Sequence, residues 1–75
     1  MSVILGVSGS EVARATANLL AKGASLGTAR DRAHNEGPTD ENMLALRNAR
    51  GDLEVAAIEY TRAVDRLGVA RARAA

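Results

Sequence analysis

The chain has 75 residues and a net charge of +1, with no cysteine and a single aromatic residue, Tyr60. This length describes one small domain over residues 1–75, and the lack of cysteine excludes disulfide bridges and thiolate metal sites. Alanine supplies 16 residues, which favour helix but bury little apolar area, so the core is expected to contribute only about 3–5 kcal/mol. Self-association or a partner protein is therefore expected to stabilise the fold.

Residues 1–9, "MSVILGVSG", are β-branched and then rich in glycine, which predicts either a short strand or an extended N-terminal arm that becomes ordered against a partner. They lack the basic start of a secretory leader, and no stretch approaches the roughly 20 apolar residues that span a bilayer. We expect synthesis in the cytoplasm, with incorporation into an extracellular or virion assembly as an open alternative. Ser8 or Ser10 is a candidate N-cap for a helix over residues 10–36, with Glu11 in its first turn.

That first helix places apolar residues on one stripe, interrupted by Lys22. Gly23 and Gly27 each weaken a helix by about 1 kcal/mol relative to alanine, so a kink or break between them is an open alternative.

A turn is predicted at residues 37–39, where the apolar pattern stops at "NEGPTDEN". Gly37 can end a helix in the left-handed conformation, and Pro38 cannot continue one. Thr39 or Asp40 then caps a second helix over residues 40–70, followed by a basic tail at 71–75. A short connection makes two long helices antiparallel neighbours, so the predicted fold is an all-α helical hairpin.

The second helix alternates large and small apolar residues at spacings of three and four, which is typical of a coiled-coil interface. We expect its large residues to pack on the apolar stripe of the first helix. The predicted intramolecular seam comprises Val12, Leu19 and Leu26 from the first helix and Leu46, Leu53, Tyr60 and Leu67 from the second.

A second group of residues falls on the opposite side of the same helix, and one partner helix cannot cover both sides. This group, the predicted partner interface, consists of Leu44, Gly51, Val55, Ile58 and Val69. Isolated surface aliphatic residues are normal in proteins, and this is the alternative interpretation. The closeness of Val55 and Ile58 to a glycine, in a chain with few large apolar residues, favours the interface.

Four arginines, Arg62, Arg66, Arg71 and Arg73, form a candidate basic patch near the end of the chain. Cations at a helix C-terminus suit the helix dipole, and this interpretation is preferred because aromatic stacking residues are missing. Nucleic acid is therefore a less favoured partner.

No residues indicate catalysis, a cofactor or a metal. His34 has no neighbouring ligand in the pattern, and "GVSGS" at residues 6–10 lacks the final glycine and the strand–helix context of a nucleophile elbow. The chain is expected not to be an enzyme.

The turn and the start of the second helix, "GPTDENMLAL", resemble the subunits of type III secretion needles. Pro38-Thr39-Asp40 matches the turn of that family and Leu44-Ala45 its leucine-alanine pair, whereas Glu41 replaces a second proline. The resemblance covers about residues 37–66. It implies a structural role, in which helical hairpins polymerise into a hollow conduit with their C-terminal helices facing the lumen.

Three functions follow from these observations. The favoured one is a non-enzymatic structural subunit that self-associates into an oligomer, ring or filament, or joins a larger protein assembly. The alternatives are a small adaptor, inhibitor or chaperone that binds one protein partner, and a weak binder of nucleic acid through the arginines.

Overall fold

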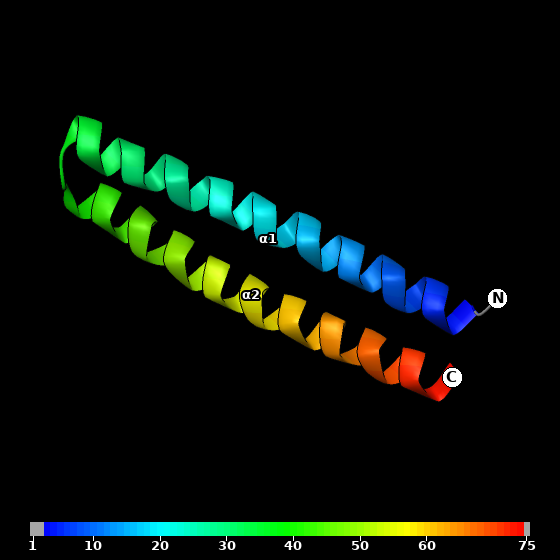
Figure 1. Ribbon diagram of the computed structural model, residues 1–75. Coiled ribbons are helices and arrows are strands. Elements are labelled where there is room, and N and C mark those ends of the chain that lie inside the picture. Colours follow the sequence, from blue (N-terminus) through cyan, green and yellow to red (C-terminus); the bar gives the residue numbers. More distant parts are fainter. Residues whose placement is uncertain (1–2, 75) are drawn as a thin grey trace.

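The computed structural model describes residues 3–74, with side chains described from residue 10 to residue 73. Two helices, α1 (Val3–Glu36) and α2 (Asp40–Ala74), lie antiparallel, so that both chain ends are at one end of the molecule and the turn is at the other (Figure 1). The molecule measures 54 × 14 × 12 Å, and its radius of gyration is 16.8 Å. A compact chain of this length would have about 11 Å. The predicted all-α hairpin is therefore confirmed, and its dimensions show that it is elongated like a rod.

The start of α1 differs from the predicted start at Ser10. The helix begins at Val3, so most of the predicted extended arm is helical, and only residues 1–2 lie outside the described residues. Propagating an existing helix adds one hydrogen bond per residue fixed, and the segment contains no proline to oppose it. Helix propagation therefore outweighs the β preference of the branched residues in this segment.

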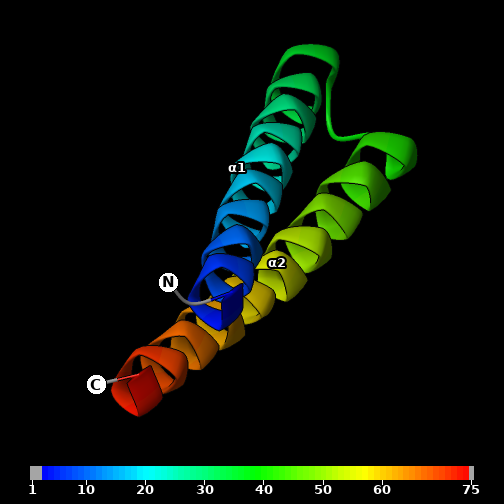
Figure 2. The same cartoon turned by 90° about the vertical axis from the view of Figure 1, so that its right-hand side faces the viewer.

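The helix also runs without a break through Gly23 and Gly27, as a second view of the hairpin shows (Figure 2). The break that the sequence left open is absent from the described helix. Each glycine costs about 1 kcal/mol in a helix, which is too little to interrupt 34 residues packed along a partner.

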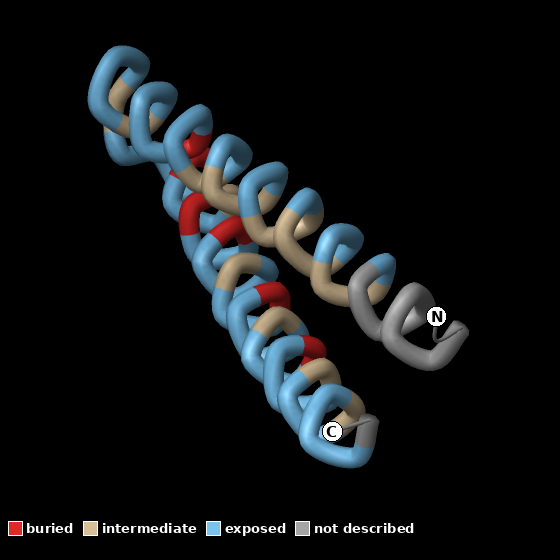
Figure 3. Tube along the Cα trace, turned by 45° about the vertical axis from the view of Figure 1, so that its right-hand side comes forward, coloured by how far each residue is buried: buried red, intermediate tan, exposed pale blue. Residues whose placement is uncertain are grey.

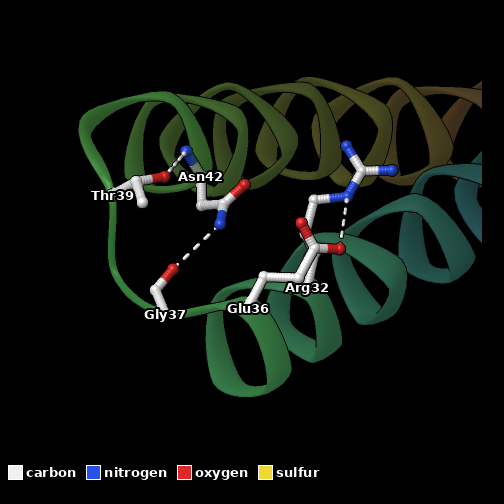
Figure 4. Close-up of polar contacts among 5 residues, drawn as sticks. All are labelled: Arg32, Glu36, Gly37, Thr39 and Asn42. Carbon is white, nitrogen blue, oxygen red and sulfur yellow. Dashed lines mark hydrogen bonds and ion pairs between the residues drawn. The ribbon is translucent and has the colours of Figure 1, made fainter.

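The turn at residues 37–39 has the predicted chemistry. Gly37 has a φ of +103°, a conformation that favours glycine. Thr39 is the N-cap of α2, because its hydroxyl accepts a hydrogen bond from the backbone N–H of Asn42 at 3.1 Å. The Asn42 side chain in turn donates a hydrogen bond to the Gly37 carbonyl at 2.8 Å (Figure 4). The end of one helix is thus tied directly to the start of the next.

The helix α2 extends four residues beyond the predicted end at Ala70, and the predicted basic tail is therefore helical as far as Ala74. Asp40 and Glu41 lie in its first turn and Arg71 and Arg73 in its last, so both ends carry charges that complement the helix dipole. This stabilisation at each terminus explains why the helix continues to the end of the described residues.

Alanine rather than leucine occupies most of the buried positions, which line the facing sides of the two helices (Figure 3). The buried apolar residues are Ala29, Leu46, Ala49, Ala56 and Ala63. Within them, Ala29, Leu46 and Ala49 form one cluster, against which Leu26 packs. No large side chain of the described part of the chain is fully buried.

The predicted seam residues line this interface, but they are less buried than expected. Of the seven, Leu46 is buried, and six are half-buried: Val12, Leu19, Leu26, Leu53, Tyr60 and Leu67. Two helices alone leave the sides of a large seam residue open to water, whereas an alanine between them is covered completely. The hairpin therefore does not hide its own apolar surface.

Candidate interaction surface

An apolar stripe runs along the side of α2 that faces away from α1. We call it the α2 outer stripe, and it consists of the predicted interface residues Leu44, Gly51, Val55, Ile58 and Val69. The four aliphatic side chains are 57%, 57%, 52% and 51% exposed, in that order, and Gly51 is also exposed. Half of each aliphatic side chain is therefore in contact with solvent.

The rotation of an α-helix explains why these residues share a face. At about 100° per residue, the stripe occupies an arc of roughly 60° opposite the seam. Residues Leu44, Gly51 and Ile58 follow one another at seven-residue intervals, and Val55 fills the same side between them. A helix with two such faces can pack against two neighbours at once, and the hairpin supplies only one of them.

Polar residues interrupt the stripe. Asn48, Arg62 and Asp65 continue its three-and-four spacing, and all three are exposed. Gly51 leaves a gap, because a Cβ atom built there would meet no atom within 4 Å. The surface is thus a mixture of aliphatic, charged and small positions.

Other exposed apolar residues were not singled out from the sequence. Leu20 of α1 is 70% exposed, and Met43 and Val64 are also exposed. Leu20 lies on the outer side of α1, where its neighbours Ala13, Ala17 and Ala24 are small. Because Leu20 follows the seam residue Leu19, a rotation of about 100° could have predicted that it is exposed. It is the one large residue among alanines on that face, so no stripe pointed to it.

Three of the four arginines, Arg62, Arg66 and Arg73, fall within about 40° on one side of α2. Arg66 pairs with Glu11 across the two helices, and Arg62 and Arg66 line a shallow depression together with Arg14, Glu11 and Glu59. Arg71 is nine residues from Arg62, which turns it by about 180° to the other side of α2. Arg71 and Arg73 lie in the last turn of α2, as the helix-dipole interpretation expects.

Asn42 is a structural residue that sequence reasoning missed. It is the buried polar residue of the described chain, at 7% exposure, and it occupies a seam position seven residues before Ala49. One signal for this role was present in the sequence: Asn42 is a polar residue at a position where the spacing predicts an apolar one, three residues after the candidate N-cap Thr39.

In residues 3–74, no three histidine, aspartate or glutamate side chains lie close enough together to hold a metal ion. Neither described helix has an apolar stretch sufficient to cross a membrane. Comparison with models of protein families, with curated proteins and with solved structures gave no match.

Proposed function

We propose that this chain is a non-enzymatic structural subunit that self-associates through the α2 outer stripe. One observation carries the proposal: four of the chain's few large aliphatic residues lie on a single face of α2 and are half-exposed. Large apolar residues that gather on one face of a small protein mark an interaction site, whereas the same residues scattered over its surface would not.

The total surface area supports this interpretation. The hairpin exposes 5537 Å², whereas a compact monomer of 7.8 kDa would expose about 4,400 Å². The excess of about 1,100 Å² exceeds the roughly 800 Å² that one partner contributes to a standard protein interface. A neighbouring molecule would bring the hairpin close to the exposure of an ordinary domain.

The expected association is weak. Covering the exposed half of one such aliphatic side chain contributes about 1 kcal/mol, so eight of them in two copies contribute roughly 8 kcal/mol. The loss of translational and rotational freedom costs about 4–15 kcal/mol. Association is therefore expected to depend on protein concentration.

Two other functions use the same surface differently. An adaptor or inhibitor would present the α2 outer stripe to one different protein and remain a monomer in isolation. A needle-like subunit, which the turn sequence resembles, would build an open filament that lengthens with concentration. The mass of the particle in solution distinguishes both from a small closed oligomer.

The test is sedimentation of the purified protein over a wide concentration range, with a double variant, Val55→Asp and Ile58→Asp. We expect the wild type to gain mass with concentration and the double variant to remain a monomer, because two carboxylates would be buried without partners. Leu20→Asp is the control, since it places one such carboxylate at a more exposed aliphatic position on α1. The control should associate like the wild type.

Circular dichroism completes the experiment. Both substituted positions are exposed in the hairpin, so the double variant should keep most of its helical signal. If helicity and association are lost together, the two residues belong to the internal core. If the wild type is a compact monomer at high concentration, self-association is the wrong function.

A further inference from the structure

We propose that the partner of the α2 outer stripe is the same stripe of a second copy, packed antiparallel about a two-fold axis that passes between residues 56 and 57. This inference rests on the proposed self-association and adds its symmetry and register. An isologous contact requires a surface that is complementary to itself, and the order of residues along α2 meets that requirement.

Self-complementarity is visible in the aliphatic residues. With the axis between residues 56 and 57, each residue faces a residue of the second copy, and the two residue numbers add up to 113. Val55 then faces Ile58 of the second copy, and Leu44 faces Val69. All four half-exposed aliphatic side chains are thus paired with one another, and the symmetry forms each pair twice.

The interrupting polar residues fit the same register. Arg62 faces Gly51 of the second copy, which leaves room for the guanidinium to lie beside Asp52. Asp65 faces Asn48 and lies beside Arg47 of the second copy. Both charges in the stripe therefore meet an opposite charge, although the register was fixed by the aliphatic residues alone.

The flanking positions agree with the geometry of antiparallel helices. On such a pair, residues on one edge of a helix meet the same edge of the partner. Helical rotation places Asp65 and Arg47 on the same edge of the stripe, whereas Arg62 lies near its centre and reaches toward the edge that carries Asp52. The pair of Asp65 and Arg47 therefore shares an edge.

A head-to-tail contact of the stripe with α1 is less favourable. The outer side of α1 offers Leu20 among Ala13, Ala17 and Ala24, so the four aliphatic residues of α2 would meet one large side chain. The antiparallel pair joins α2 to α2 instead, and gives a closed dimer in place of an open filament.

Cysteine cross-linking tests the register, because the natural chain contains no cysteine. Leu44→Cys and Val69→Cys are prepared separately, oxidised alone and oxidised as a mixture. The mixture should form a disulfide-linked dimer at least tenfold more efficiently than either variant alone. In the proposed register, two copies of Cys at position 44 are separated by about 25 residues of helix, or roughly 38 Å.

A charge exchange gives an independent measurement. Arg62→Asp should weaken dimerisation about tenfold, and the further change Asp52→Arg should restore it. The two residues are ten positions apart, about 15 Å along the same helix, so the rescue requires contact between copies.

The outcomes separate this inference from the proposed function. Cross-linking of Leu20→Cys with Val55→Cys, or of Leu44→Cys with itself, in a protein that still associates overturns the two-fold register alone. Association without rescue by the charge exchange also overturns it. A wild-type monomer at high concentration overturns the proposed function and this inference together.

Discussion

Replacing glycine by alanine at different positions of the hairpin should change stability in opposite directions. Within α1, Gly23 and Gly27 lie in a continuous helix, and a Cβ atom at either position would meet nothing within 4 Å. Alanine should therefore stabilise the helix by about 0.8–1.0 kcal/mol at each position, through the lower conformational entropy of the unfolded chain. At Gly37, a Cβ atom also has open space, but the φ of +103° is strained for alanine, so a cost of about 1–2 kcal/mol is expected.

These values correspond to measurable changes in melting temperature. For a domain of this size, 1 kcal/mol shifts the melting temperature by about 4–8 °C. Thermal unfolding followed by circular dichroism, at one protein concentration for all variants, should show increases for Gly23→Ala and Gly27→Ala and a decrease for Gly37→Ala. Neither α1 position lies on the proposed dimer face. A decrease at Gly23 or Gly27 would mean that α1 is kinked or tightly packed there, and an unchanged Gly37→Ala would refute the left-handed turn.

Two further predictions concern the packed interface. Asn42→Ala should lower the free energy of unfolding by about 1 kcal/mol, because the Gly37 carbonyl loses its hydrogen bond, whereas Asn35→Ala at an exposed position should change it little. Ala56→Leu should destabilise the hairpin by about 1–3 kcal/mol, because Ala56 is only 1% exposed and has no room for a larger side chain. Ala57→Leu, at the adjacent exposed position, should remain within about 0.5 kcal/mol of the wild type. Urea unfolding measures all four, and equal losses for Ala56→Leu and Ala57→Leu would contradict the packing.

The turn was predictable from sequence because its residues have few alternatives. Gly37 and Pro38 each restrict the backbone through their own covalent structure, independently of the rest of the fold. The N-cap was narrowed to Thr39 or Asp40, and the hydrogen bond from Asn42 to the Thr39 hydroxyl decides between them. The role of the Asn42 side chain could not be predicted, because it depends on where the Gly37 carbonyl points.

The helix boundaries and the depth of burial were harder to predict. Spacing alone shows which residues share a face, and so it placed Val55 and Ile58 opposite the seam, where they are exposed. It does not show how closely two helices approach, and this distance decides that Ala56 is buried while Leu53 is half-buried. The start at Val3 lies seven residues before the predicted start at Ser10, because a helix that has formed gains a hydrogen bond with each residue added.

Different interactions hold the two helices together at the two ends of the hairpin. At one end the turn joins the helices covalently, and Thr39 and Asn42 stabilise it with hydrogen bonds. Toward the other end, the ion pair between Glu11 and Arg66 links a half-buried glutamate to an exposed arginine, and ion pairs near the surface contribute little. Thermal separation of the two helices should therefore begin at the end of the hairpin opposite the turn and proceed toward the turn.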